Sequence, residues 1–336
     1  MMDSRKEEKM GIQILGTGSF VPERIVENEE FTQYVETSDE WIVKHSGIKR
    51  RHLHDGANFE MAVQAAQRAL ENAGLSAEDL DMILCTTVTS DYYTPSLACI
   101  VQGKIGASSA IAFDINAACA GFVFGLDVAH LYLQNGMRRI MVISSEKLSQ
   151  ITDYTDRSTC VLFGDGAGAV ILGPSDRPFA SVLGTDGTGA CTLFARHKEN
   201  SVPFVQTRST QSCDGFIESK PEILYMDGHK VYKFAVTAMP KAVREVCEKY
   251  GIALDQIDWL IPHQANIRII QTANSALKFP MEKTICNIAE RANTSSACIP
   301  IALDEAIRDG RIQKGQTICL VGFGAGLVYG SAIFEY

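Results

Sequence analysis

The feature that most constrains the fold of this 336-residue chain is an internal repeat. Residues 59–72 have helical apolar periodicity, end at Gly74, and lead through LSAEDLD into an apolar run. Residues 231–250 do the same, end at Gly251, and lead through IALDQID into a second apolar run. An aspartate follows each glycine at the same spacing, and the shift that carries Gly74 onto Gly251 is close to half of the chain. A glycine at a helix C-terminus is common, but the matched spacing indicates a duplication.

Unbroken apolar runs between the helical segments predict the strands. Residues 110–116, 139–144 and 317–321 are examples. Strands buried on both faces, as in parallel sheets covered by helices, lack the alternation of apolar and polar residues. The predicted class is therefore α/β.

We expect three segments along the chain. These are a flexible N-terminal tail at residues 1–10, an N-terminal half at 11–174 and a C-terminal half at 175–336. No linker rich in Pro and Ser separates the halves. The polar, turn-rich stretch at 185–219 predicts a surface excursion that joins them.

Two glycine-rich segments, residues 164–168 and 322–326, precede strand-like runs. A dinucleotide-binding loop follows a strand, opens a helix and has the spacing G-x-G-x-x-G. Neither segment meets these conditions, so we interpret both as β-turns.

Composition excludes several function classes. The net charge of -9 argues against nucleic-acid binding, which needs a basic balance. The ten cysteines and seven histidines are dispersed without metal-ligand spacing, so we expect no metal site and no disulfide framework. No run approaches the ~18 apolar residues of a membrane span, and no signal peptide is evident. These observations predict a cytoplasmic protein.

Cys119 is the candidate nucleophile. It lies where the predicted strand at 110–116 gives way to a helical pattern that continues to His130. A thiol in the first turn of a helix faces unpaired N–H groups and the positive end of the dipole, which favour the thiolate. The small neighbours of Cys119 allow a substrate to approach.

A nucleophilic cysteine needs a polar partner, and two residues qualify. His263 follows the predicted strand at 259–261, where parallel sheets present functional groups. By itself, such a histidine is more often a surface or capping residue. Asn293 precedes the predicted helix at 299–308 and, considered alone, is typical of an N-cap.

Seven ordered motifs between residues 11 and 336 resemble the β-ketoacyl-[acyl-carrier-protein] synthase III family of the thiolase superfamily. They are ILGTGSFVPE, TSDEWIVKHSGI, AACAGF, TDRSTCVLFGDGAGA, DWLIPHQANIRII, NTSSACIP and ALDEAIRDGRIQKGQ. The resemblance implies a five-layered αβαβα fold of two halves related by a pseudo-twofold axis, and a homodimer. This agrees with the repeat found independently.

The resemblance also implies the reaction, the initiating condensation of type II fatty acid synthesis. Cys119 matches the cysteine that accepts an acyl group from acetyl-CoA or another short acyl-CoA. His263 and Asn293 match the pair that supports decarboxylation of malonyl-[acyl-carrier protein] and its condensation. Coenzyme A enters as a thioester substrate, and no cofactor is implied. The N–H of Cys119 and one from residues 324–326 are expected to stabilise the tetrahedral intermediate.

Binding residues are implied in the same way. Trp41 and Arg157 match the pair that sandwiches the adenine of coenzyme A. The pantetheine tunnel matches Gly228, Asn266, Phe323 and Gly324. The segment expected to dock the acidic carrier protein comprises Gln264, Ala265, Asn266, Ile267 and Arg268, with Lys233 nearby.

Four positions depart from the family pattern. His45 stands where an arginine often contacts the phosphate end of coenzyme A. Ala292 and Ala325 replace glycines, so the backbone there must tolerate a Cβ atom. Thr94 replaces a frequent phenylalanine at the floor of the acyl pocket, which predicts a roomier pocket.

Other functions are weighed against this one. A degradative thiolase carries a second cysteine in its C-terminal glycine-rich turn, but residues 322–326 contain none and Cys319 comes three residues too early. A ketosynthase III relative of secondary metabolism would keep the same three polar residues and stays open. A non-catalytic acyl-binding partner subunit is disfavoured because all three are present.

Overall fold

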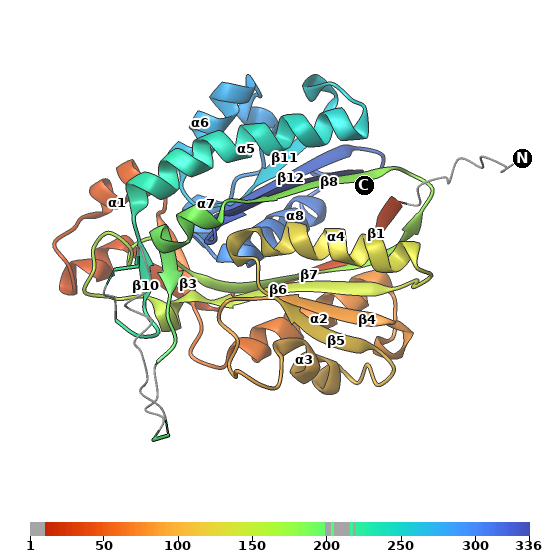
Figure 1. Cartoon of the computed structure of the whole chain (residues 1–336), viewed down its shortest axis with the longest axis horizontal. Coiled ribbons are helices and arrows are strands. Elements are labelled where there is room, and N and C mark those ends of the chain that lie inside the picture. Colours follow the sequence, from red (N-terminus) through yellow and green to blue (C-terminus); the bar gives the residue numbers. More distant parts are fainter. Residues whose placement is uncertain (1–10, 199–202, 205–215, 218–219) are drawn as a thin grey trace, which may run out of the picture.

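The structure is a computed structural model that describes residues 11–198, 203–204, 216–217 and 220–336. The predicted tail at residues 1–10 lies outside the described residues. In the described part, two β-sheets are stacked with helices between them, and further helices cover both outer faces (Figure 1). The expected αβαβα layering is confirmed.

The first sheet has five strands and belongs to the N-terminal part of the chain. In spatial order they are β1 (Gly11–Phe20), β7 (Asp165–Ser175), β6 (Ile140–Lys147), β4 (Met82–Thr86) and β5 (Ile111–Ile115). β4 pairs in parallel with β5 and β6, whereas β7 is antiparallel to β1 and β6. Parallel pairing, as predicted from the unbroken apolar runs, is therefore limited to one side of a mixed sheet.

The second sheet has four strands. In spatial order they are β11 (Trp259–Pro262), β12 (Thr317–Gly324), β13 (Val328–Glu335) and β8 (Phe179–Thr185). Only β11 and β12 are parallel, and the other pairs are antiparallel. Both sheets therefore combine a parallel side with an antiparallel side.

Three layers of helices enclose the two sheets (Figure 1). The inner layer consists of α4 (Gly121–Gln134) and α8 (Cys298–Arg308). α2 (Asn58–Ala73) and α3 (Leu97–Ile105) cover the outer face of the first sheet. α5 (Gly228–Tyr250) and α6 (Ile267–Leu277) cover the second sheet.

β4 shows why its apolar run has no alternation. Met82 and Leu84 pack into the core that includes α4 and α8. Ile83 and Cys85 point to the other face and pack into the core below α2 and α3. Successive side chains on a strand face opposite sides, so a strand covered on both sides must be apolar throughout.

Short elements gather at one end of the sheets, on the left of Figure 1. They are β2 (Arg24–Glu27), α1 (Asp39–Ser46), β3 (Arg50–Leu53), β9 (Leu193–Ala195), β10 (Leu224–Met226) and α7 (Ile288–Arg291). Several of them share a small apolar core around Ile42, Ile48 and Ile288.

The repeat predicted from the sequence is present as structure. Gly74 caps the C-terminus of α2 with φ +64°, and Gly251 caps that of α5 with φ +88°, a left-handed conformation that favours glycine. The Asp81 carboxylate accepts hydrogen bonds from N–H groups just before β6. The Asp258 carboxylate accepts one from the N–H of Thr317, at the start of β12. Each aspartate thus ties its strand to the neighbouring strand.

The same shift along the chain, from Gly74 to Gly251, relates the two helices of the inner layer. α4 begins at Gly121 and α8 begins at Cys298. A residue with positive φ precedes each helix, Ala118 at +44° and Ser295 at +50°. The two halves therefore contribute equivalent elbows, in which a short 3-10 turn leads into a central helix.

The predicted boundary between residues 174 and 175 falls inside the first sheet, one residue before the end of β7. β7, in the first sheet, ends at Ser175, and β8, in the second, begins at Phe179. The division into halves at 11–174 and 175–336 remains a prediction.

The prediction of two glycine-rich β-turns is wrong for the first segment. Gly166 and Gly168 lie inside β7. A Cβ atom on Gly168 would lie 2.8 Å from the Cβ of Pro300 and 2.9 Å from the N atom of Ile301. These glycines are therefore needed because α8 packs directly on the strand. The second segment ends β12, and only residues 325–327 form a turn.

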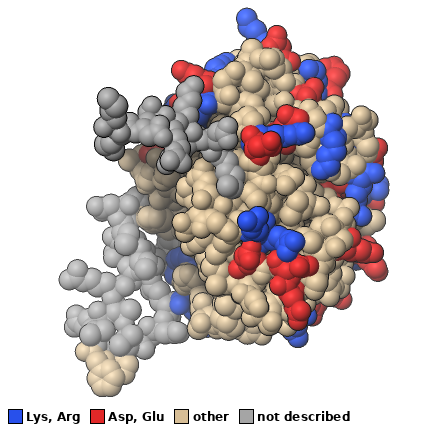
Figure 2. Space-filling model, turned by 90° about the vertical axis from the view of Figure 1, so that its right-hand side faces the viewer, with Lys and Arg blue, Asp and Glu red and all other residues tan. Residues whose placement is uncertain are grey.

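In the described part of the chain, none of the helices combines the length and apolarity required to cross a bilayer. On the face turned toward the viewer in Figure 2, acidic and basic side chains are interspersed. That face is the right-hand side of Figure 1, away from the short elements around α1. The visible face therefore has no uniformly basic area to which an acidic partner could bind.

Candidate active site

Cys119 lies in the N-terminal elbow, as the sequence predicts. β5 ends at Ile115, a 3-10 turn spans Ala118–Ala120, and α4 begins at Gly121. The end of β12 packs against this elbow, and a Cβ atom on Gly324 would lie 2.6 Å from the N atom of Cys119. Gly324 is therefore required for the close approach of the C-terminal half to the nucleophile.

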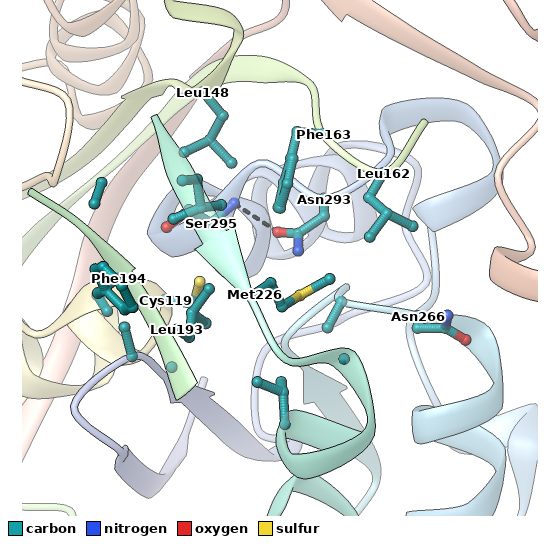
Figure 3. A pocket seen from close by; sticks show the side chains of 18 of the residues that line it. Cys119, Leu148, Leu162, Phe163, Leu193, Phe194, Met226, Asn266, Asn293 and Ser295 are labelled. Carbon is teal, nitrogen blue, oxygen red and sulfur yellow. Dashed lines mark hydrogen bonds between the residues drawn. The ribbon is translucent and has the colours of Figure 1, made fainter. Parts of the chain in front are cut away.

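A cavity of about 620 Å³ brings the three predicted catalytic residues together. Cys119, His263 and Asn293 all line it. Figure 3 shows Cys119, Asn293 and the neighbouring Ser295 around one space. Among the described residues, no three His, Cys, Asp or Glu side chains are grouped so that they could hold a metal ion.

The pKa of Cys119 differs from the sequence expectation. Burial raises the pKa of the Cys119 thiol to about 12, and the nearby Glu146 carboxyl acts in the same direction. A hydrogen bond with the Ser295 side chain opposes this rise. Burial of the sulfur therefore opposes the stabilisation of the thiolate that is predicted from the helix dipole, and Cys119 lies one short turn before α4.

His263 directly follows β11 and is anchored by its backbone. Its N–H donates to the carbonyl of Val321 in β12 at 2.8 Å. The residue is 1% exposed, and burial lowers the pKa of the imidazole to about 3. The ring is therefore neutral at physiological pH. The Phe323 ring meets it edge-on, with 5.2 Å between centroids.

Asn293 is held by the N-terminal half and by its own turn. Its N–H donates to the carbonyl of Leu162, and its carbonyl accepts from the N–H of Gly164, both at 3.0 Å. The side-chain Oδ1 accepts the N–H of Ser295 at 2.9 Å, drawn as the dashed line in Figure 3. The other end of the amide, Nδ2, has no hydrogen-bond partner among the described residues and can donate to a molecule in the cavity.

Glu146, at the end of β6, links the two halves beside this site. It is fully buried, and desolvation raises the pKa of its carboxyl, although hydrogen bonds oppose the rise. Oε2 accepts from Thr87 Oγ1, Val88 N and Thr89 Oγ1, and Oε1 accepts from Ser295 Oγ and Ser296 Oγ. One carboxyl therefore fixes the turn after Asn293 relative to the loop after β4.

Trp41 and Arg157 lie together as predicted, but in direct contact. The guanidinium carbon of Arg157 is 4.8 Å from the centre of the Trp41 ring. An adenine ring between them needs about 7 Å, twice the usual contact distance. Arg157 is exposed, and its side chain also donates to the carbonyl of Glu36 at 3.0 Å, so it has to break this hydrogen bond to move aside. His45 stacks on Trp41 with 4.4 Å between ring centroids.

The residues predicted for the pantetheine tunnel all line the cavity: Gly228, Asn266, Phe323 and Gly324. Asn266 caps α6, since its side chain accepts the N–H of Arg268. Its Nδ2 donates to the carbonyl of His45 in α1 at 2.9 Å. Asn266 therefore joins the two helices that flank this part of the cavity.

The carrier-docking prediction needs one correction. Gln264 is 0% exposed, and its side chain donates to the carbonyls of Pro262 and Ile285. It therefore cannot contact a docked protein, because its polar atoms hold the loop together from inside. Ala265, Asn266 and Ile267 are partly exposed, and Arg268 and Lys233 are exposed.

Thr94 does not line the cavity of its own chain. It is exposed, and so are the neighbouring Tyr92 and Tyr93. Its predicted place in an acyl pocket requires a second subunit that brings this segment to the other cavity. The roomier pocket stays a prediction.

The stretch at 185–219, predicted to be a surface excursion that joins the halves, also contributes to the cavity in its described part. Leu193, Phe194 and Phe216 line the cavity, as does Met226 on the paired strand β10. Figure 3 places Phe194 and Leu193 beside Cys119. A segment that is mostly polar and turn-rich therefore contributes apolar side chains to the wall of the cavity. The adjacent residues Leu193 and Phe194 were the available signal.

Sequence reasoning also missed Glu146, Ser295 and Cys298. Ser295 and Cys298 stand in the quoted motif NTSSACIP, but nothing in a motif shows which side chain meets which partner. Of the two alanines that replace glycines, Ala292 adopts φ +57°. That conformation is unfavourable for a residue with a Cβ atom. Ala325 is not among the residues with positive φ.

Comparisons with known proteins agree with this architecture. The family described as 3-Oxoacyl-[acyl-carrier-protein (ACP)] synthase III matches residues 113–187, and its C-terminal part matches residues 247–336. The beta-ketoacyl-[acyl-carrier-protein] synthase III of Caldanaerobacter subterraneus subsp. tengcongensis is 45% identical over 335 residues, 98% of this chain and 99% of that protein.

Two solved structures are similar in fold and sequence. The 3-oxoacyl-[acyl-carrier-protein] synthase III from Aquifex aeolicus VF5 has a TM-score of 0.87 and 39% identity, covering 97% of this chain and 100% of that chain. The priming beta-ketosynthase from the R1128 polyketide biosynthetic pathway has a TM-score of 0.87 and 34% identity, covering 98% of each chain.

The five layers and the central cavity define a condensing enzyme with a thiolase-like fold. The sequence identity over nearly the whole chain also shows the family. The chain belongs to the β-ketoacyl-[acyl-carrier-protein] synthase III family. It is an acyltransferase that catalyses the initiating condensation of type II fatty acid synthesis.

Proposed function

We propose that Cys119 holds the acyl group while His263 and Asn293 act on the malonyl substrate. One observation supports this assignment: the Cys119 thiol, the neutral imidazole of His263 and the amide of Asn293 all line the same largely apolar cavity. Only the thiol is a nucleophile. The imidazole is neutral, and the free end of the Asn293 amide is a donor.

In the first half-reaction, the Cys119 sulfur attacks the carbonyl carbon of an acyl-CoA. The bond between that carbon and the coenzyme A sulfur breaks, and coenzyme A leaves as the thiol with the proton from Cys119. The N–H of Cys119 and an N–H of the turn at 324–326 stabilise the oxyanion of the tetrahedral intermediate. The contact of Gly324 with the Cys119 backbone supports this pairing.

In the second half-reaction, malonyl-[acyl-carrier protein] loses carbon dioxide and leaves an enolate. His263 and Asn293 donate hydrogen bonds to the enolate oxygen, each worth ~3 kcal/mol of stabilisation. The enolate carbon attacks the thioester carbonyl on Cys119. A carbon–carbon bond forms, the bond to the Cys119 sulfur breaks, and the thiolate that leaves takes a proton from water.

Substrate binding follows from the surroundings of the cavity. We assign Trp41 and Arg157 to the adenine of coenzyme A, with Arg157 moving aside. Gly228, Asn266, Phe323 and Gly324 line the way for pantetheine, as their positions around the cavity support. Ala265, Asn266, Ile267 and Arg268, with Lys233, dock the carrier protein.

We further propose a homodimer in the cytoplasm. The exposed segment at 92–95 needs a partner subunit if Thr94 is to reach an acyl pocket. The nine cysteines in the described residues are all free, which is typical of a reducing compartment.

A ketosynthase III role in secondary metabolism is the second candidate. The apolar wall formed by Leu193, Phe194 and Met226 favours it, because such a wall accepts primers larger than acetyl. Comparing kcat/KM for acetyl-, butyryl-, isobutyryl- and hexanoyl-CoA tests whether the wall admits larger primers, and the neighbouring genes distinguish the two candidates.

Mass spectrometry after incubation with acetyl-CoA tests the first assignment. We expect one acetyl group on the peptide that contains Cys119. Cys99→Ala, which removes an exposed cysteine, should keep the adduct, and Cys119→Ala should lose it. An adduct that persists in Cys119→Ala contradicts the assignment.

A further inference from the structure

His263 has a buried partner that the mechanism so far does not use. Cys298 is the first residue of α8, it is 2% exposed, and its Sγ lies 2.9 Å from Nδ1 of His263. The N–H of Gln264 donates to the same sulfur at 3.3 Å. One thiol therefore contacts both the imidazole and the loop that follows it.

The proton positions follow from counting donors and acceptors. A neutral imidazole carries one N–H, and the partner of one ring nitrogen decides which nitrogen carries it. The Cys298 sulfur already accepts the N–H of Gln264. Its own S–H needs an acceptor, and Nδ1 of His263 is at hydrogen-bond distance.

The opposite arrangement, with the hydrogen on Nδ1 of His263, leaves the hydrogen-bonding groups of Cys298 without suitable partners. If Nδ1 carried the hydrogen, the Cys298 sulfur would have to accept two hydrogen bonds, although a thiol is a weak acceptor. Its S–H would then have no other acceptor in hydrogen-bond range among the described residues. A polar hydrogen without a partner is costly at a buried site.

The charge states of both groups are fixed by burial. Burial raises the pKa of the Cys298 thiol well above its usual range and lowers the pKa of His263 to about 3. The pair therefore holds two protons throughout the physiological range, one on sulfur and one on the ring.

We propose that Cys298 is a positioning residue that fixes His263 as the Nε2–H tautomer, so that the ring donates a hydrogen bond into the cavity. This deepens the proposed function, because the enolate oxygen needs a donor. In the other tautomer the lone pair of Nε2 would face that oxygen. The N-terminal half has no such device, since α4 begins with Gly121 at the position equivalent to Cys298.

The direct test is the tautomer of His263 in the full chain with ¹⁵N-labelled histidine. Two-bond ¹H–¹⁵N correlation spectra distinguish the two tautomers, and loss of a signal in His263→Gln assigns the residue among the seven histidines. We expect the Nε2–H form in the native protein. Finding the Nδ1–H form overturns the proposal without any variant of Cys298.

Matched substitutions then test the cause. Cys298→Ser keeps a donor of similar size and should keep the Nε2–H form. Cys298→Val fills the space without a donor and should give the Nδ1–H form or a mixture. An unchanged tautomer in a folded Cys298→Val overturns the proposal.

Kinetics separate this proposal from the proposed role of His263. In Cys298→Val, kcat for carbon dioxide release from the malonyl thioester should fall about tenfold or more at nearly constant KM. Cys298→Ser should recover most of this loss. Acetyl transfer to Cys119 should change little in both variants. A changed tautomer with unchanged decarboxylation would support the action of Cys298 on the ring and contradict the proposed role of His263.

Discussion

The two elbows of the molecule have the same backbone and opposite uses. Cys119 and Ser296 occupy equivalent positions in the two halves, each one residue after a residue with positive φ. Cys119 lines the cavity, whereas Ser296 is fully buried and donates to Glu146 at 2.7 Å. The duplicated backbone thus places a reactive side chain in the cavity in one half and a buried, hydrogen-bonded side chain in the other.

The strand ends show the same division. Thr86 ends β4 at the position equivalent to His263, and its Oγ1 is 2.6 Å from Ser144 Oγ. Glu146 is equivalent to Phe323, the ring that covers His263. Polar groups are therefore paired with each other in the N-terminal half, while an apolar ring leaves His263 available in the C-terminal half. Equivalent positions in a duplication do not imply equivalent roles.

The largest effect is expected when one side chain in each elbow is replaced by alanine, first Cys119 and then Ser296. Cys119→Ala should lower acyl transfer by about 10⁴-fold or more, because the nucleophile is removed. Ser296→Ala should keep most of this activity and instead lower the free energy of unfolding by about 1–3 kcal/mol, because Glu146 loses a buried donor. Single-turnover acyl transfer and urea unfolding measure the two effects. Equal loss of acyl transfer in both variants would contradict the division.

The two equivalent asparagines give a crossed test. Oδ1 of Asn293 accepts the N–H of Ser295, and Oδ1 of Asn116 accepts the N–H of Ala118 at 3.3 Å. Asn293→Ala should lower condensation by about 10²- to 10³-fold and leave acylation of Cys119 intact. Asn116→Ala should slow acylation by about fivefold, the equivalent of one hydrogen bond, and leave decarboxylation unchanged. If Asn293→Ala folds but no longer acylates, the assignment is wrong.

The pH dependence of the free energy of unfolding should distinguish His263, after β11, from Thr86, at the equivalent end of β4. His263 has a pKa of about 3 in the folded chain and an ordinary value of 6.5. Below pH 6.5 the unfolded chain therefore binds a proton that the folded chain does not, and this contribution to stability is lost as the pH falls. At pH 5 the loss is about 2 kcal/mol.

His263→Gln should flatten the stability profile between pH 7 and pH 5 by that amount. Thr86→Val, at the equivalent strand end, should leave the slope unchanged because threonine does not titrate. Urea unfolding at the two pH values gives the comparison. An unaltered slope in His263→Gln would mean that the ring is not held neutral.

The smallest effect concerns the surface. Arg268→Glu should raise KM for the malonyl-carrier substrate about fivefold, since an exposed charge contact is worth about 1 kcal/mol. Arg138→Glu makes the same charge change just before β6, at the opposite end of the strands, and should have no effect. Acetyl transfer from coenzyme A should be unchanged in both. Similar damage to both half-reactions in Arg268→Glu would refute a docking role.

The duplication and the elbow at Cys119 were predictable from sequence because they depend on local patterns. Helix-ending glycines, unbroken apolar runs and small residues around Cys119 are visible in a single chain. The mixed pairing of the sheets was not, since β1 and β7 are paired although they lie far apart in the chain, and no local signal records their direction. Position in the sequence makes His263 and Asn293 candidate polar partners, and the resemblance assigns them their roles.

The missed features depend on desolvation and on contacts between distant segments. The helix dipole at Cys119 is visible in the local sequence, whereas the burial that raises the pKa of its thiol depends on distant segments. Gln264 has the sequence context of a docking loop, yet its side chain points inward. Glu146 meets Ser295 from the other half of the chain, a pairing that no spacing rule predicts.

Carbon dioxide release from a labelled malonyl thioester by Cys119→Ala tests most directly the claim that the halves divide the reaction. His263, Asn293 and the Cys298 contact stay intact in this variant, so decarboxylation should continue although no acyl-enzyme forms. Asn293→Ala, measured in parallel, should acylate normally and release little carbon dioxide. Loss of carbon dioxide release in a folded Cys119→Ala would show that the two elbows act as one unit and would contradict the account.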